Sequence, residues 1–379
     1  MNNIPFNKPY IAGSEEKYIH EVIESRQLSG NGRFTNKCHD LFKKLFGFRN
    51  CLLTSSCTDA LEMCAILLDI QPGDEVIIPS YTFVSTANAF ALRGAKIVFI
   101  DSSSASPNMN PELLQGLITS RTKAIVVVHY AGIACEMDTI LSIASKHNIF
   151  VVEDAAQAID SYYKGKPVGG FGHLAAFSFH ETKNIISGEG GMLVINDQQF
   201  EGRAEIVWEK GTNRKAFFAG AIDKYGWIDL GSSFLPSEIT AAFLFAQLEK
   251  LQEIQTLRKA IWKHYQTKLQ VLEDSRSGSL PFIPISASLN GHMFYLVCQD
   301  NHTRNSLIEY LKSKNISSVF HYQSLHKAAF FKGKHIQQNL PWSDHYSDCL
   351  LRLPFYNELT RTDQDHVIKK VIDFFGLRS

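Results

Sequence analysis

The sequence lacks an excess of either charge, because its 38 lysine and arginine residues are balanced by 38 aspartate and glutamate residues. This balance gives no indication of a nucleic-acid partner or of a membrane-surface partner. No apolar run approaches the roughly 20 residues that span a membrane. Residues 1–5 resemble neither a signal peptide nor a transit peptide. We therefore expect a protein that works in solution, away from membranes and nucleic acids.

The sequence also lacks a cysteine motif: it has seven cysteines, an odd number, and none of them forms a CxxC pair. Cys51, Cys57 and Cys64 lie near one another, but their spacing matches no zinc signature, so we expect no metal site. Reduced thiols are typical of the cytoplasm, where we place the protein. A GxGxxG run is missing from the first strand–helix turn, which argues against a dinucleotide-binding dehydrogenase.

What is present is an alternation of short apolar strands with helical segments. Apolar, β-branched runs predict strands at residues 76–79, 96–100, 124–128 and 149–152. Amphipathic patterns predict helices at residues 15–28, 35–46 and 136–148. This alternation predicts an α/β fold with a mostly parallel central sheet that helices cover on both faces.

The pattern changes near residue 236, where one long amphipathic helix is predicted over residues 236–270. Beyond it we expect strands at residues 292–297 and 318–321 and helices at residues 303–314 and 362–375. Thr303 is expected to cap the first of these two helices. The chain's 379 residues suffice for two units. We expect a large α/β domain over residues 1–240, and a bridging helix with a small C-terminal α+β domain over residues 241–379.

Two charged residues follow apolar runs that end predicted strands. Residues 150–152 lead to Asp154, and residues 177–179 lead to Lys183. Parallel strands present their carboxyl ends to ligands in α/β proteins, so the two side chains are expected to meet. An acid for a ring nitrogen and an amine for an aldehyde carbon suit pyridoxal 5′-phosphate. Taken singly, the acid reads as a helix cap and the lysine as a solvated side chain.

Small hydroxyl residues indicate a phosphate site. Residues 54–58 precede an apolar helix, and Ser56 and Asp59 have the spacing of a capping box. A helix start offers free N–H groups and the positive end of a dipole, which suit a phosphate. Ser178 is a second candidate phosphate donor, and the glycine-rich residues 188–191 predict a tight turn beside the lysine.

Further side chains are candidates for the same site. Gln157 is expected one turn after Asp154 on one helix face, within reach of a phenolic oxygen on the ring. An aromatic residue within residues 79–86 would stack on the ring or pack in the core. Three histidine-containing pairs would line a sugar pocket or serve as structural histidines: residues 129–130, 321–322 and 325–326.

In their order and spacing these motifs resemble the sugar aminotransferases called the DegT/DnrJ/EryC1/StrS family. The resemblance extends from residue 4 to the closing helix, and the nearest branch resembles the dTDP-4-amino-4,6-dideoxygalactose transaminases. The phrases that carry it are LDIQPGDEV at residues 68–76, residues 79–90, HYAG at 129–132, SFHETKN at 178–184, EKGTNR at 209–214 and VFHY at 319–322.

The resemblance implies the aspartate aminotransferase-like fold, fold type I, and a homodimer with shared active sites. It implies transfer of an amino group from glutamate, which leaves as 2-oxoglutarate, to C4 of a dTDP-linked keto sugar for cell-surface polysaccharide synthesis. The residue roles it implies are Lys183 for a Schiff base with the cofactor, Asp154 for the ring nitrogen, Gln157 for the phenolic oxygen, Phe83 for the ring face, and Thr58, Asp59 and Ser178 for the phosphate. Tyr130, His321 and Tyr322 are the candidates for binding the sugar.

One departure concerns the cofactor phosphate. Many members of the family read Gly-x-Asn-Tyr-Arg where this chain reads GSSFL at residues 231–235. Ser233 replaces the asparagine that reaches the cofactor phosphate in the neighbouring subunit, so we expect a shorter contact or one bridged by water. Three alternatives stay open: a C3 aminotransferase, a sugar dehydratase, which would carry histidine in place of Lys183, and a non-catalytic regulator that binds pyridoxal phosphate.

Overall fold

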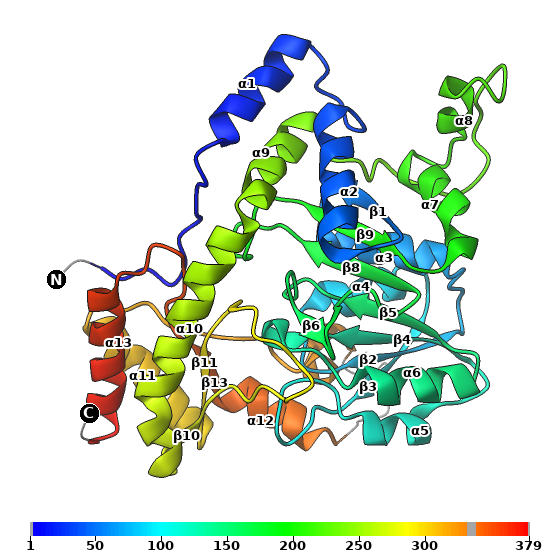
Figure 1. Ribbon diagram of the computed structural model, residues 1–379. Helices are drawn as coiled ribbons and strands as arrows, with labels where there is room; N and C mark the ends of the chain where they lie inside the picture. The colour runs from blue at the N-terminus through cyan, green and yellow to red at the C-terminus, as the bar shows by residue number, and fades with distance from the viewer. Residues whose placement is uncertain (1–2, 332–338, 378–379) are drawn as a thin grey trace.

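The computed structural model describes residues 3–331 and 339–377, and a seven-stranded sheet forms its centre (Figure 1). The strand order is β1-β9-β8-β5-β4-β2-β3. The bounds are β1 Asn50–Thr54, β2 Glu75–Pro79, β3 Lys96–Ile100, β4 Thr122–Val128, β5 Phe150–Asp154, β8 Leu174–Ser178 and β9 Gly191–Ile195. Strands β8, β5, β4, β2 and β3 pair in parallel, whereas β9 runs antiparallel to β8 and β1. The predicted mostly parallel sheet is confirmed.

Helices cover both faces of this sheet because its strands are apolar on both sides. One core contains side chains of α2 (Arg33–Phe46), α6 (Met137–Lys146) and α9 (Glu238–Glu249). The other contains side chains of α3 (Cys57–Leu67), α4 (Val84–Ala91) and α7 (Glu201–Trp208). Neighbouring residues of β4 alternate between the two, since Ile125 and Val127 belong to the first core and Ala124 and Val126 to the second.

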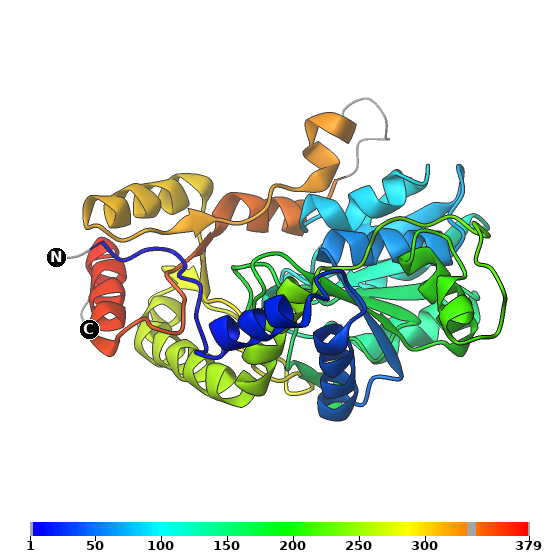
Figure 2. The same ribbon diagram turned by 90° about the horizontal axis from the view of Figure 1, so that it is seen from above.

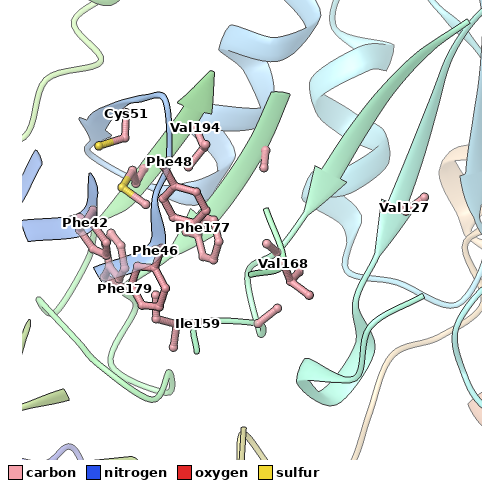
Figure 3. Packing of buried hydrophobic residues seen from close by; sticks show 14 of the residues in the cluster. Phe42, Phe46, Phe48, Cys51, Val127, Ile159, Val168, Phe177, Phe179 and Val194 are labelled. Atoms are coloured by element: carbon pink, nitrogen blue, oxygen red, sulfur yellow. The ribbon is translucent and has the colours of Figure 1, made fainter. Parts of the chain in front are cut away.

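A row of phenylalanines holds the strand that precedes the candidate lysine. The ring of Phe48 lies 5.6 Å from that of Phe177 in β8, and Phe42 of α2 stacks on Phe179 at 5.5 Å (Figure 3). Aromatic pairs of this kind contribute about 0.5–1.5 kcal/mol beyond their buried area. The rings of Phe177 and Phe179 both point into the core. Ser178 lies between these two residues and therefore faces the opposite side, where it lines a cavity.

A second, four-stranded antiparallel sheet lies beside the first (Figure 2), with strand order β10-β11-β13-β12. Its strands are β10 Gly278–Ser279, β11 Tyr295–Cys298, β12 Val319–Phe320 and β13 Leu350–Arg352, and its helices are α10 Leu251–Asp274, α11 Asn301–Ser313, α12 Pro341–Cys349 and α13 Arg361–Phe374. A separate core, which includes Tyr265, Leu307 and Val371, joins these elements. The predicted smaller α+β part is confirmed, and a domain boundary at residue 240 stays a prediction.

The first described residues join this smaller part (Figure 1). Ile4 forms a parallel bridge with Ile316, and the Phe355 N–H donates to the Phe6 carbonyl at 3.0 Å. The remaining α-helices and β-strands of the described residues are α1 Glu15–Ser25, α5 Leu114–Leu117, α8 Arg214–Phe218, β6 Tyr162–Tyr163 and β7 Lys166–Pro167. Over residues 3–331 and 339–377, no helix is long and apolar enough to cross a lipid bilayer.

Three local predictions were wrong. The helix expected over residues 236–270 is two helices, α9 and α10, which meet at Lys250, where a ψ of 9° interrupts the helix; α9 and the first turn of α10 pack in the first core, and α10 from Ile261 onward packs in the core of the smaller part. Thr303 is not a cap, because Asp300 accepts its N–H at 2.7 Å and the helix begins earlier. The strand expected from residue 292 starts at Tyr295, because the preceding residues bond to the lysine loop instead.

A buried carboxylate of α9 caps the start of α2. Glu238 is 1% exposed. It accepts the N–H groups of Gly32, Phe34 and Thr35 at 3.0, 2.6 and 3.1 Å, and the Thr35 hydroxyl at 2.5 Å. Helix α2 has no side-chain cap of its own. The carboxylate therefore satisfies the free donors of this helix and faces the positive end of its dipole.

Glu238→Gln should lower the free energy of unfolding by about 2 kcal/mol, because the amide loses the charge and leaves buried donors poorly paired. Urea unfolding followed by circular dichroism measures this loss. Glu249→Gln is the matched control: Glu249 is exposed at the other end of α9, and we expect a change below about 1 kcal/mol. Equal losses in the two variants would contradict the capping role.

Candidate active site

A cavity of about 790 Å³ is lined by residues of both sheets. Its walls come from the ends of β5 and β8 and the start of α3 on one side, and from β12, β13 and their neighbours on the other. This volume lies in the range of roughly 300–1,000 Å³ that is typical of cofactor and small-molecule sites. The predicted site residues that line it are Thr58, Phe83, Asp154, Gln157, Ser178, Lys183, His321 and Tyr322.

Asp154, the last residue of β5, carries a carboxylate that is almost fully buried. The Thr86 hydroxyl donates to Oδ2 at 2.7 Å, and the Ala156 N–H donates to Oδ1 at 3.2 Å. Burial raises the pKa of Asp154, whereas these two hydrogen bonds and the charge of Lys183 oppose the rise. A carboxylate held in this way gains free energy from pairing with a cation.

Lys183 lies in the loop after β8. Hydrogen bonds across its base close this loop: the Glu181 N–H donates to the Gly188 carbonyl at 2.9 Å, and the Ser187 N–H donates to the Phe179 carbonyl at 2.7 Å. Burial lowers the pKa of Lys183; Asp154 opposes this shift, and the cation of Arg352 adds to it. The shift favours the neutral amine, which is the form that acts as a nucleophile and as a base.

The first turn of α3 opens onto the cavity. Ser56, Cys57 and Thr58 line the cavity, and the Ser56 hydroxyl accepts the Asp59 N–H at 3.0 Å, which confirms the predicted cap. Asp59 itself is not among the lining residues. The other free N–H groups at this helix start, together with the helix dipole, suit a phosphate. Ser178 faces the same space.

Gln157 reaches the cavity from a turn and not from a helix, so its predicted setting was wrong. Residues 155–160 form turns because the helical pattern is interrupted: the Asn290 amide binds the Gln157 carbonyl at 2.7 Å. The Gln157 side chain nevertheless lines the cavity, where Nε2 donates to the Tyr322 hydroxyl at 2.9 Å. The predicted proximity to Asp154 therefore holds although the predicted helix does not.

The candidate sugar-binding residues form one aromatic cluster. His321 and Tyr322 line the cavity, with their rings stacked at 3.6 Å. Tyr130 lies behind them: it is 1% exposed, is not a lining residue, and places its hydroxyl 2.6 Å from Nδ1 of His321. The ring of Phe83 is 54% exposed and lies 6.0 Å from that of Tyr322. Tyr130 thus supports the cavity wall, and the other three form it.

Three further candidates lie away from the cavity. His129 is fully buried and pairs with Glu153 at 3.1 Å, and His326 bonds to the Ser80 hydroxyl at 2.7 Å, so both histidines have structural partners. Ser233 is exposed and does not line this cavity. A contact between Ser233 and the cofactor of a neighbouring subunit stays a prediction.

Sequence reasoning missed two residues of the site. Thr86 orients the carboxylate of Asp154, and no local pattern distinguishes it from the other threonines of residues 79–86. Arg352 lines the cavity from β13. Its signal was available, since it is the single charged residue within the apolar residues 350–353.

A sequence profile described as the DegT/DnrJ/EryC1/StrS aminotransferase family matches residues 9–372. The fold is similar to that of the aminotransferase TlmJ from Streptoalloteichus hindustanus, at 26% identity over 99% of each chain, with a TM-score of 0.91. It is similar to S. venezuelae DesV, which was solved with a ketimine intermediate, at 26% identity over 100% of each chain and a TM-score of 0.91. Spr1654 from Streptococcus pneumoniae, in its PLP form, shares the fold at 24% identity over 98% of each chain and a TM-score of 0.91.

The residues of the cavity fit pyridoxal phosphate. Asp154 offers a buried carboxylate to a protonated ring nitrogen, and Lys183 offers an amine whose pKa is lowered by burial. The start of α3 offers unpaired N–H groups to a phosphate. An amine, a carboxylate and an anion cradle in one cavity are the set that this cofactor requires.

Gly191→Ala should weaken the binding of pyridoxal phosphate roughly 10-fold or more, the effect of losing a hydrogen bond to a charged group. A Cβ at Gly191 would lie 2.4 Å from backbone atoms of Ser56 and Cys57, so the start of α3 must move. Equilibrium binding of the cofactor to the apoprotein measures the change. Gly202→Ala on α7 is the control, because a Cβ there meets nothing within 4 Å. Equal affinity in both variants would show that the close packing does not shape the cradle.

Proposed function

The chain belongs to the DegT/DnrJ/EryC1/StrS aminotransferase family, and on this premise we propose that it transfers the amino group of glutamate to C4 of dTDP-4-oxo-6-deoxy-D-glucose. The products would be 2-oxoglutarate and dTDP-4-amino-4,6-dideoxy-D-galactose, a precursor for cell-surface polysaccharide. The coarser activity, that of a sugar aminotransferase dependent on pyridoxal phosphate, follows from the family. The observation that carries the proposal is the meeting of Lys183, Asp154 and Gln157 in one cavity beside the start of α3.

The choice of sugar is supported by long phrases shared with the dTDP-4-amino-4,6-dideoxygalactose transaminases, such as residues 209–214 and 319–322. The second phrase contributes His321 and Tyr322 to the cavity wall. Together with Phe83 they supply apolar ring faces and polar ring edges, which suit the apolar faces and hydroxyl edges of a pyranose.

When bound, pyridoxal phosphate supplies the electron sink that stabilises a carbanion next to the transferred nitrogen. Asp154 would keep the ring nitrogen protonated, because its buried carboxylate needs a cation. Gln157 would donate from Nε2 to the phenolic oxygen. Thr58, Ser178 and the free N–H groups of the first turn of α3 would hold the phosphate, whereas the Asp59 N–H is engaged by the Ser56 hydroxyl.

Lys183 would hold the cofactor through Nζ until the donor amine displaces it. The released amine would then carry a proton between the substrate carbon and the cofactor carbon, which lie on either side of the transferred nitrogen. Its lowered pKa suits this role, since more of the amine is neutral near pH 7. Asp154 is 6% exposed, which limits the access of water to its carboxylate.

We also propose a cytoplasmic homodimer. The segment after α7 exposes an apolar surface in the single chain: Phe218 is 69%, Tyr225 51%, Trp227 80% and Ile228 54% exposed. Exposed aromatic surface of this kind is typical of protein contacts. Ser233 follows on the same exposed stretch, where it would reach the cofactor phosphate of a second copy.

The purified protein, given L-glutamate and dTDP-4-oxo-6-deoxy-D-glucose, should form a product whose NMR spectrum shows an amine at C4 in the galacto configuration. The visible absorbance of the bound cofactor should shift with glutamate and return with the sugar. Lys183→Ala should abolish both changes, because no other lysine lines the described cavity.

The outcomes separate the alternatives. An amine at C3 would refute the C4 assignment, and an amine with the gluco configuration would refute the product. Loss of a sugar hydroxyl without gain of nitrogen would identify a dehydratase. A cofactor spectrum without turnover of any nucleotide sugar would favour a non-catalytic regulator.

Asp154→Asn should lower the rate by several orders of magnitude, comparable to the roughly 10⁴-fold loss seen when a neutral isostere replaces a catalytic aspartate. The neutral amide no longer holds a proton on the ring nitrogen. Thr86→Val is the control, because it removes one hydrogen bond and keeps the charge, with an expected loss of about 10-fold. Steady-state rates measure both, and a near-normal rate for the asparagine variant would require another acid at the ring.

A further inference from the structure

His292 lines the cavity with one ring nitrogen free. It is 6% exposed, and its Nδ1 lies 2.8 Å from Oδ1 of Asn184, the residue that follows Lys183. Among the residues that the structure describes, no group bonds to Nε2 of His292. This nitrogen is not sealed in the core, in contrast to Nε2 of His366, which is buried without a hydrogen-bond partner. His292 therefore presents Nε2 to the cavity, and the tautomer of the ring decides whether Nε2 donates or accepts.

A chain of amides fixes this tautomer. The carboxylate of Asp160 can only accept, so its 3.1 Å contact with Gln255 of α10 comes from the amide nitrogen Nε2. Oε1 of Gln255 then faces Asn184 and accepts its Nδ2 at 2.8 Å. The Asn290 carbonyl, which also only accepts, receives the same two amide nitrogens at 3.0 and 2.9 Å. Oδ1 of Asn184 is thereby left to accept the proton on Nδ1 of His292.

The ring of His292 is neutral, so its second nitrogen carries a lone pair. Burial lowers the pKa of His292 well below its usual value, and nearby cations add to the shift. These cations are Lys183, Arg258 and Arg352. With the single proton on Nδ1, Nε2 is a hydrogen-bond acceptor, and an acceptor left unpaired in a cavity calls for a donor. The same burial and cations keep His292 from taking up a proton, so it can orient a donor but does not act as the base.

The donor that fits is the amine of Lys183. Within the described residues, Nζ of Lys183 forms no hydrogen bond or ion pair, although it lines the same cavity. After burial, the charge of Lys183 is the largest cause of the lowered pKa of His292, so the two groups are near each other. Asp154, the buried carboxylate of the cavity, serves the ring nitrogen in the proposed function. An unpaired donor and an unpaired acceptor thus share one wall of the cavity.

We propose that His292 is a positioning residue for Lys183: Nε2 accepts one N–H of the amine once the amine is released from the cofactor. The inference rests on the role proposed for Lys183 and holds for any sugar. Holding one N–H restricts rotation about the Cε–Nζ bond, so that the lone pair of the amine points to the carbon from which it takes the proton. When the amine has gained that proton, the same contact stabilises the ammonium until the proton is passed on.

Two variants of His292 separate this role from a purely structural one. The amide nitrogen of asparagine is as many bonds from Cα as Nδ1 of histidine, so His292→Asn keeps the bond to Asn184 and removes the acceptor in the cavity. The amide oxygen of glutamine is as many bonds from Cα as Nε2, so His292→Gln keeps the acceptor and loses the bond to Asn184. A structural histidine would tolerate asparagine better, whereas a positioning histidine would tolerate glutamine better. Thermal unfolding shows how far each variant is destabilised.

Single turnovers of the holoenzyme with L-glutamate, followed by the absorbance of the cofactor, report the proton transfer. His292→Asn should lower the rate at saturating glutamate roughly 10- to 100-fold, the range for a hydrogen bond to a charged group. The kinetic isotope effect with L-glutamate deuterated at the α-carbon should rise, because proton transfer then limits the rate. The half-saturating concentration of glutamate should stay within about 2-fold of the wild type, since the lost contact is not one with bound glutamate. His292→Gln should recover most of the rate.

The apoprotein gives a second readout that does not depend on turnover. Trinitrobenzenesulfonate modifies the neutral amine of a lysine, so the pH dependence of the modification of Lys183, followed by mass spectrometry of its peptide, gives the pKa of that amine. Loss of an acceptor destabilises the ammonium. His292→Asn should therefore lower the pKa of Lys183 further, by about 1 to 2 pH units, and His292→Gln should lower it by less.

An unchanged rate and isotope effect in His292→Asn would overturn the inference, and so would a pKa of Lys183 equal to that of the wild type. Greater damage in His292→Gln than in His292→Asn would assign His292 to the structure of the lysine loop and would also overturn it. A defect confined to the sugar half of the reaction would assign Nε2 to a sugar hydroxyl, with the same consequence. A wild type that does not react with glutamate or with the sugar would refute the proposed function, while the apoprotein comparison would still decide on His292.

Discussion

The burial of the Asp154 carboxylate is the constraint on which the rest of the site depends. A charge at the end of a buried strand is costly unless hydrogen bonds and a cation compensate it. Thr86 of α4 and the Ala156 N–H each bond to one of its oxygens. Helix α4, the turn after β5 and the lysine loop converge here for that reason. The pyridinium of the family's cofactor is the cation that we propose to complete the set.

Much of the large sheet was predictable because strands buried on both faces have to be apolar throughout. The bounds of strands β2 to β5 were predicted within a few residues. Strands β1 and β9 were not predicted, and their pairing joins residues that are far apart in the sequence. The break at Lys250 escaped prediction because the helical pattern continues through it.

The chemical residues Asp154 and Lys183 were predictable because each interrupts or ends an apolar run. Arg352 also interrupts one, but the sequence could not tell a paired arginine from an unpaired one. That distinction depends on side chains far away in the chain, as Arg258 demonstrates with its three acceptors. Ser233 marks a different limit, because its proposed partner belongs to a second copy of the chain.

The joining of residues 4–6 to the smaller sheet has a consequence for the order in which the site is completed. Phe6 lines the cavity, yet its carbonyl has no partner until Phe355 has been synthesised. A growing chain therefore contains Lys183 and Asp154 long before Arg352, and contacts across such separations form late in folding. An incomplete chain released from the ribosome would contain the amine of Lys183 but would lack the part of the cavity wall that Arg352 forms. The wall of the cavity is thus complete only when Phe6 and Arg352, which are far apart in the sequence, have met.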